Sequence, residues 1–214
     1  SLGEPDFDTP EVLKAAGIKA IEENITHYTP VPGILDVREA ISQKFKRDNG
    51  LDYAPDQIVV SNGAKQSITN VVLSLVDPGE EVILPAPYWV SYADMVALAG
   101  GTSKVLATSI EHDFKIQPEA LEAAITDKTR LLIYSSPCNP SGSVYTQSEI
   151  DALAEVLQRH PQVYIISDEI YELINFTGKH ASIGTIPALK DRVITVNGVS
   201  KGFAMTGWRL GYIG

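Results

Sequence analysis

The segment RVITVNGVSKGFAMTGWRLGYI, residues 192–213, contains two short apolar runs on either side of a loop rich in small residues. The runs, residues 192–197 and 209–213, carry the β-branched and aromatic side chains that favour strands. Between them, Lys201 lies among serine, glycine and alanine residues. A surface lysine needs no small neighbours, because its flexible stem reaches water from almost any setting. We therefore expect a ligand to lie against this loop.

Further apolar runs extend this pattern to most of the chain. Several runs are apolar throughout, as is typical of strands that are covered on both faces. The predicted strands span residues 57–61, 81–86, 103–108, 130–136, 162–167, 192–197 and 209–213. Helical patterns alternate with them, so we predict an α/β fold with a mostly parallel seven-stranded sheet sandwiched by helices.

Three predicted helices have clear sequence boundaries. One begins at Thr9-Pro10, with proline at the first helical position. A second places apolar residues at helical spacing over 35–45 and ends before Asn49-Gly50. A third opens with a capping box from Thr146 to Glu149 and stops before Pro161.

The composition excludes several classes of partner. The 17 basic and 27 acidic residues give a net charge of −10, which disfavours binding to nucleic acid or to an anionic membrane. No apolar run reaches 18 residues, and the first residues lack the pattern of a secretory signal, so we expect a cytoplasmic protein. The single cysteine, Cys138, excludes an internal disulfide, and the four histidines have no ligand spacing. We therefore expect surface histidines, a packed thiol and no metal site.

Polar residues gather where the predicted strands end. Asp168 and Tyr171 follow the strand at 162–167, Asn139 follows 130–136 and Lys201 follows 192–197. The turn NGAKQ, residues 62–66, follows 57–61 and leads into a helix whose free amides could hold a phosphate. Ligands of open α/β sheets bind beyond the carboxyl ends of the strands. Each residue alone could serve a cap or a turn, but together they predict a binding site.

Seven motifs in order resemble the class I aminotransferases of the aspartate aminotransferase type, which are fold type I enzymes that use pyridoxal 5'-phosphate (PLP). The motifs are GEPDFDTP, YTPVPGILDVREAI, SNGAKQ, PYWVSY, PCNPSG, SDEIY and VSKGFAMTGWRLGY. By contrast, the sequence contains neither a Walker motif nor the dinucleotide-binding fingerprint G-x-G-x-x-G.

The resemblance implies a role for each matching residue. Lys201, Asp168 and Tyr171 would be catalytic, with Lys201 forming the Schiff base and Asp168 meeting the pyridine nitrogen of the cofactor. Trp89 would stack on the cofactor ring, and Tyr28 would reach the phosphate of a neighbouring subunit. The residues expected to bind the cofactor are Tyr28, Gly63, Ala64, Lys65, Trp89, Asn139, Asp168, Tyr171, Ser200, Lys201 and Arg209. The residues expected to contact the substrate are Gly3, Lys65, Trp89 and Asn139.

The resemblance also implies how the protein is organised. Residues 1–27 would form an approach segment that links to a small domain, and residues 28–214 would form a PLP-binding large domain that is incomplete at its C-terminus. The arginine that grips the substrate α-carboxylate in this family would lie outside the present chain. A homodimer with shared active sites is expected from the position of Tyr28.

The implied activity is the transfer of an amino group from an L-amino acid to 2-oxoglutarate by a ping-pong mechanism through a Schiff base. Aspartate is the preferred donor on sequence grounds, because a lysine at the position of Lys65 is associated in this family with acidic substrates. Aromatic, alanine or kynurenine aminotransferases and β-lyases share the same frame and stay open as alternatives. A module of this fold that binds PLP without catalysis is an alternative of another class.

Overall fold

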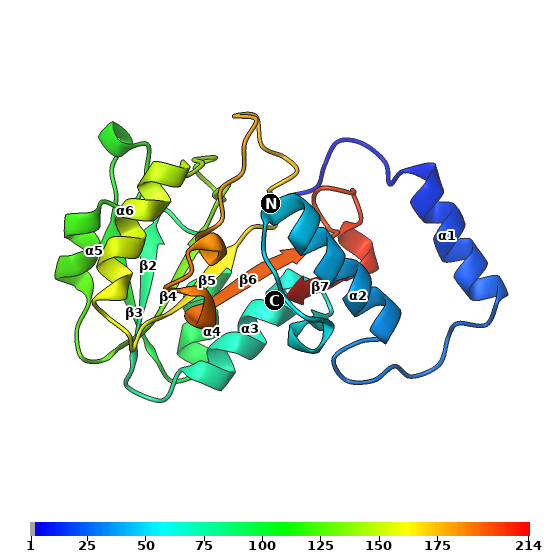
Figure 1. The fold of residues 1–214 in the computed structure, drawn as a ribbon, viewed down its shortest axis with the longest axis horizontal. Helices are drawn as coiled ribbons and strands as arrows, with labels where there is room; N and C mark the ends of the chain where they lie inside the picture. The colour runs from blue at the N-terminus through cyan, green and yellow to red at the C-terminus, as the bar shows by residue number, and fades with distance from the viewer. Residues whose placement is uncertain (1–2) are drawn as a thin grey trace.

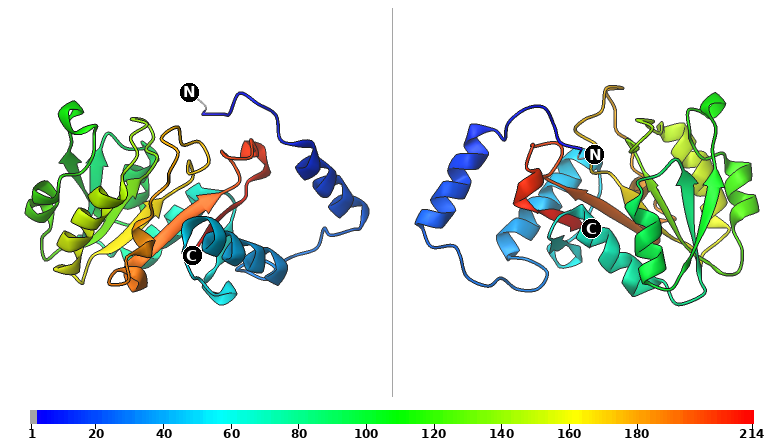
Figure 2. Two further views of the ribbon diagram at one scale, coloured as in Figure 1. Left: turned by 45° about the horizontal axis from the view of Figure 1, so that its top comes forward. Right: turned by 180° about the vertical axis from the view of Figure 1, so that it is seen from behind.

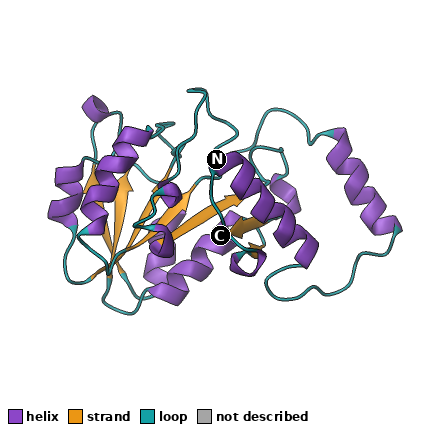
Figure 3. Ribbon diagram, in the orientation of Figure 1, coloured by secondary structure: helices purple, strands orange, loops and turns teal. Residues whose placement is uncertain are grey.

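A computed structural model describes residues 3–214 of the chain. A central sheet lies between two layers of helices (Figure 1; Figure 3). Its strands are β1 (Val59–Ser61), β2 (Glu81–Ala86), β3 (Thr102–Ala107), β4 (Thr129–Ser135), β5 (Tyr164–Asp168), β6 (Val193–Gly198) and β7 (Gly211–Ile213). Its α-helices are α1 (Glu11–Glu22), α2 (Leu35–Lys44), α3 (Ala64–Leu75), α4 (Ser91–Leu98), α5 (Pro118–Ala124) and α6 (Gln147–Gln158). Each predicted strand is therefore confirmed, with its ends displaced by no more than two residues.

The strand order is β1-β7-β6-β5-β4-β2-β3. Pairs among β2 to β6 are parallel, whereas β7 runs antiparallel to both of its neighbours, β1 and β6. The prediction of a mostly parallel seven-stranded sheet is confirmed. The carboxyl ends of the parallel strands consequently meet at one edge of the sheet, where the predicted site residues follow them.

Side chains of the central strands alternate between two apolar cores. On β4, Leu131 and Ile133 pack toward α3 and α4, whereas Leu132 and Tyr134 pack toward α5 and α6. This alternation follows from the two-residue period of a strand, and it explains why the runs are apolar throughout. Because Leu131 is fully buried, its replacement by alanine should cost about 2–5 kcal/mol of stability.

The three helices predicted from sequence are confirmed. Helix α1 starts at Glu11, so Pro10 is its N-cap residue and not the first helical residue that the sequence predicted. Helix α2 ends at Lys44 and continues as a π-helical turn over Phe45–Asn49, which Gly50 closes in the left-handed conformation. Helix α6 has the capping box, in which the Thr146 hydroxyl accepts from the amide of Glu149 and the Glu149 carboxylate accepts from the amide of Thr146.

Helix α1 lies away from the sheet and from the other α-helices in all three views (Figure 1; Figure 2). Its Gly17 nevertheless packs against the Trp208 ring, because a Cβ added there would lie 2.6 Å from that ring. The helix has no buried residue, and its apolar side chains Val12, Ile18 and Ile21 are exposed. The chain before it crosses the loop after β6, where the Thr9 hydroxyl donates to the carbonyl of Ala204 at 2.6 Å. The division into an approach segment at 1–27 and a large domain at 28–214 stays a prediction. Among residues 3–214, none of the helices is long and apolar enough to cross a bilayer.

Candidate active site

Lys201 follows β6 and lies under the N-terminal segment. Its Nζ donates a hydrogen bond to the carbonyl of Gly3 and lies 5.8 Å from the centroid of the Tyr171 ring. Burial lowers the pKa of Lys201, and the nearby charge of Arg209 lowers it further, whereas Glu4 opposes the shift. A lower pKa increases the fraction of free amine at neutral pH, which is the nucleophilic form.

Asp168 ends β5 and is buried on the sheet face that packs against α3 and α4. Its carboxylate accepts from the Tyr92 hydroxyl at 2.6 Å and from the amide of Ile170 at 3.2 Å. Burial nevertheless raises the pKa of this carboxyl to about 6, against an ordinary value of 3.8. Within residues 3–214 no basic side chain forms an ion pair with Asp168. A buried carboxylate of this kind is stabilised by a cationic group of a ligand.

Asn139 and Tyr171 come from neighbouring strand ends and meet at the same edge. The Asn139 Nδ2 donates to the Tyr171 hydroxyl at 3.4 Å. Burial raises the pKa of Tyr171, and the charge of Asp168 adds to this shift, so the phenol keeps its proton and can donate. The peptide bonds Ser136-Pro137 and Asn139-Pro140 are both cis.

The turn between β1 and α3 forms a cradle for an anion. Gly63 adopts φ +84°, and a Cβ added there would lie 2.2 Å from the Nη2 of Arg209. The guanidinium therefore packs directly on the backbone at the start of α3. The first amides of a helix lack partners within the helix, so those of Ala64 and Lys65 and the positive end of the helix dipole face the same region. Free amides beside an arginine are the usual elements of a phosphate site.

Trp89 lies between a lysine and a buried tyrosine. The Nζ of Lys65 is 4.8 Å from the centroid of the Trp89 ring, and the Tyr92 ring contacts Trp89 edge to face at 5.5 Å. Ser200 is buried next to Lys201. Tyr28, in contrast, is fully exposed on the segment that follows α1, so the structure does not bring it to the other predicted residues.

Tyr92 is the site residue that sequence reasoning missed. It is 1% exposed, and it contacts both Asp168 and Trp89. The same small pocket is lined by Tyr92, Cys138 and Asn139. The signal was present in the motif PYWVSY, where the second tyrosine comes three residues after Trp89 and lies in the first turn of α4.

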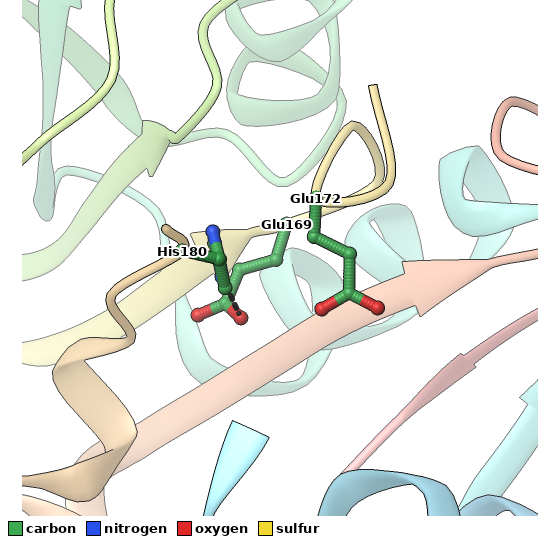
Figure 4. A group of neighbouring side chains, drawn as sticks. All are labelled: Glu169, Glu172 and His180. Carbon is green, nitrogen blue, oxygen red and sulfur yellow. Dashed lines mark hydrogen bonds and ion pairs between the residues drawn. The ribbon is translucent and has the colours of Figure 1, made fainter. Parts of the chain in front are cut away.

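His180 corrects one expectation from the sequence, because it is not a surface histidine. Its side chain is 12% exposed, and its Nε2 lies 2.7 Å from the Glu169 carboxylate (Figure 4). Ligand atoms of His180, Glu169 and Glu172 all lie within 4.8 Å of one another, a spacing that suits a metal ion. The Lys44 ammonium is bonded to Glu172, however, and it already supplies positive charge there. The expectation of no metal site stays a prediction.

Every other arginine of the described chain is engaged away from this edge. Arg47 pairs with Asp48, and Arg159 pairs with Glu122. The remaining three donate to backbone carbonyls: Arg38 to Gly33 and Pro55, Arg130 to Leu75, and Arg192 to Leu157, His160 and Val163. Arg209 is thus the arginine that residues 3–214 bring to the candidate site.

The fold and the site together define an α/β domain with a half-buried lysine, a buried carboxylate and an anion cradle at one edge of a mostly parallel sheet. The chain belongs to the family described as aminotransferase class I and II, whose sequence profile matches residues 1–214.

The relatives and similar structures agree with this assignment. The chain is 56% identical over 214 residues to the bifunctional aspartate aminotransferase and glutamate/aspartate-prephenate aminotransferase of Petunia hybrida, covering 100% of this chain and 45% of that protein. The aspartate aminotransferase structure from Rhizobium meliloti superposes with a TM-score of 0.98 at 46% identity, covering 100% of this chain and 54% of that one. The aromatic aminotransferase structure from Pyrococcus horikoshii superposes with a TM-score of 0.96 at 43% identity. This match covers 100% of this chain and 57% of that one. The chain therefore spans about half the length of the relatives it matches.

Proposed function

We propose that the protein containing this chain is a PLP-dependent aminotransferase that moves the amino group of an L-amino acid to a 2-oxo acid. The observation that carries the proposal is the placement of Lys201 beside Tyr171 at the sheet edge where the buried carboxylate of Asp168 lies. A reactive amine and a carboxylate without a basic partner match the aldehyde and the protonated ring nitrogen of PLP.

The described residues fit the remaining parts of the cofactor. The backbone at Gly63, Ala64 and Lys65, together with Ser200 and Arg209, would hold the phosphate, because a Cβ at Gly63 would displace the guanidinium that completes the cradle. Asn139 and Tyr171 would donate to the phenolic oxygen, and Trp89 would cover the ring face. When bound, PLP supplies a ring that withdraws electrons from the substrate Cα.

The chain's own groups would then carry the proton transfers. Lys201 would hold the cofactor through Nζ and, once freed by the substrate amine, would use the same nitrogen to remove the Cα proton. Asp168 would keep the pyridine nitrogen protonated, which matters most when negative charge develops at Cα. Gly3, whose carbonyl contacts Lys201, would lie next to the substrate carboxylate.

Aspartate with 2-oxoglutarate is the first candidate substrate pair. The Lys65 ammonium lies over Trp89 at the site and can meet the distal carboxylate of an acidic donor. The names of the relatives add prephenate as a second acceptor, with aspartate or glutamate as donor. Aromatic donors stay an alternative, because one of the similar structures is an aromatic aminotransferase. Activity as a β-lyase, or PLP binding without turnover, would contradict the proposal.

A homodimer with shared sites and a cytoplasmic location complete the proposal. The fully exposed Tyr28 ring is available to a neighbouring subunit. One cysteine in 214 residues suits a reducing compartment.

Amino-donor and acceptor screening of the full-length polypeptide tests the proposal. We expect release of a 2-oxo acid from aspartate in the presence of PLP, and a lower kcat/KM for aspartate but not for an aromatic donor in Lys65→Met. Lys128→Met, which changes an exposed lysine, serves as the control. Release of a side-chain group with ammonia, or no turnover of any donor, would contradict the assignment.

A further inference from the structure

The turn from Asp168 to Glu172 presents two different faces. Asp168 and Tyr171 lie at the candidate active site, whereas Glu169 and Glu172 enter a buried polar cluster on the other side of the chain. The opposite directions of Asp168 and Glu169 follow from the alternation of side chains at the end of β5. Whatever fixes Glu169 therefore also fixes the backbone that carries Asp168.

Glu169 is 0% exposed, and both of its carboxylate oxygens accept hydrogen bonds. Its Oε1 accepts from the hydroxyls of Ser167 at 2.9 Å and Ser182 at 2.5 Å. Its Oε2 accepts from the Nε2 of His180 at 2.7 Å and from the Nδ2 of Asn49 at 3.5 Å. A carboxylate only accepts hydrogen bonds, so the His180 Nε2 carries the proton in this contact.

Glu172 extends the cluster to the end of α2. It accepts from the Asn49 Nδ2 at 2.5 Å and from the ammonium of Lys44, and Lys44 in turn donates to the Asn49 side-chain oxygen at 2.6 Å. Lys44 is separated from Glu172 by 128 residues. The cluster thus ties β5 and its turn to the end of α2 and to the loop that carries His180 and Ser182.

Opposite charges hold the side chains of this cluster together. Two buried carboxylates face the Lys44 ammonium and the imidazole of His180. Burial lowers the pKa of His180, but the hydrogen bond that its Nε2 donates to Glu169 and the charges of both carboxylates raise the pKa by more. A buried ionic cluster contributes little net stability, because desolvation offsets the attraction, but it fixes geometry strongly.

We propose that Glu169 is a positioning residue, which anchors the turn so that Asp168 and Tyr171 face the cofactor. It acts through the backbone and touches neither cofactor nor substrate. The effect of Glu169 on cofactor binding rests on the proposed function. Its anchoring of the backbone at residues 168–172 does not depend on any cofactor.

The experiment compares four forms of the full-length polypeptide: wild type, Glu169→Gln, Ser182→Ala and Glu122→Gln. Glu122 is a matched control because it also accepts from a histidine, His160, at 2.8 Å, but its side chain on α5 is 41% exposed. Two quantities are measured: amide hydrogen exchange of peptides covering residues 168–174, and the PLP dissociation constant. The Glu169 amide donates to the Val196 carbonyl at 2.9 Å, so its exchange reports directly on the anchoring.

Glu169→Gln should speed exchange at 168–174 and weaken PLP binding about tenfold, the equivalent of one hydrogen bond to a charged group. Ser182→Ala should show the same changes to a smaller degree, and it decides the question if Glu169→Gln does not fold. Glu122→Gln should change neither quantity. Unchanged exchange, or faster exchange with unaltered PLP affinity, would overturn the inference. Failure of the wild type to bind PLP would contradict the proposed function. The amide hydrogen exchange at residues 168–174 would then still test whether Glu169 anchors the turn.

Discussion

Tyr92 and Asp168 are joined by a buried hydrogen bond of 2.6 Å from the phenol to Oδ2, although 76 residues separate them in the sequence. Burial raises the pKa of Tyr92 well above its ordinary value, with the charge of Asp168 adding to the shift, so the tyrosine is the donor. The bond favours the ionised form of Asp168, which is the form that a protonated pyridine nitrogen requires.

Tyr92→Phe should therefore raise the pKa of Asp168 above about 6 and weaken PLP binding at neutral pH about tenfold. The measurement is a PLP titration at several pH values, in which the rise of affinity with pH moves to higher pH. Tyr53→Phe is the control, since it removes a comparable hydroxyl that bonds Thr195 at 3.0 Å away from the site. Equal behaviour of the two variants would show that Tyr92 contributes packing only.

The pH dependence of stability should carry a signature of Asp168. Because its folded pKa is about 6 and its ordinary value is 3.8, the folded protein holds a proton at intermediate pH that the unfolded chain has released. Its contribution to stability is therefore largest below the ordinary value and falls as pH rises to about 6, by roughly 3 kcal/mol in all. Urea unfolding of the PLP-free wild type should show this decline relative to Asp168→Asn. Parallel curves for the two proteins would mean that Asp168 titrates normally.

The anion cradle should not tolerate a side chain at Gly63. Gly63→Ala places a Cβ 2.2 Å from the Nη2 of Arg209 and adds strain at φ +84°. We expect PLP affinity to fall at least tenfold, roughly one lost charge-assisted contact, while the affinity for pyridoxal without phosphate changes little. Isothermal titration with both ligands makes the comparison.

Gly50→Ala separates strain from steric conflict. Gly50 also has a positive φ, +69°, but a Cβ there would meet nothing within 4 Å. This variant should lose stability without selective loss of PLP affinity. An equal effect of both variants on PLP binding would argue against the cradle.

Local patterns were enough to predict the elements of this fold. The strand β4 was predicted because Leu131 to Tyr134 are apolar throughout, and α6 because Thr146 and Glu149 form a capping box. The strand order and the antiparallel β7 were not predicted, because pairing between strands far apart in sequence leaves no local period to read.

Long-range contacts also limit what the sequence shows of the site. Lys201, Asp168 and Asn139 were predicted to lie at one edge of the sheet because each comes at or just after the end of an apolar run, and the structure places all three at that edge. Tyr92 was missed because an aromatic residue in a helix is typical of a core. His180 was wrongly expected at the surface, since its partner Glu169 belongs to a different segment and only folding brings the two together.

Lys201 is the residue proposed to hold the cofactor, through its Nζ. The full-length polypeptide is loaded with PLP, reduced with borohydride, digested and examined by peptide mass analysis, with Lys201→Ala treated in parallel. Lys65 is an internal control, because it lies at the same cradle but is not expected to react. We predict the pyridoxyl phosphate mass increase on the peptide that contains Lys201, and its loss in Lys201→Ala. A label on Lys65 or another lysine, or no label in a protein that binds PLP, would contradict this role of Lys201.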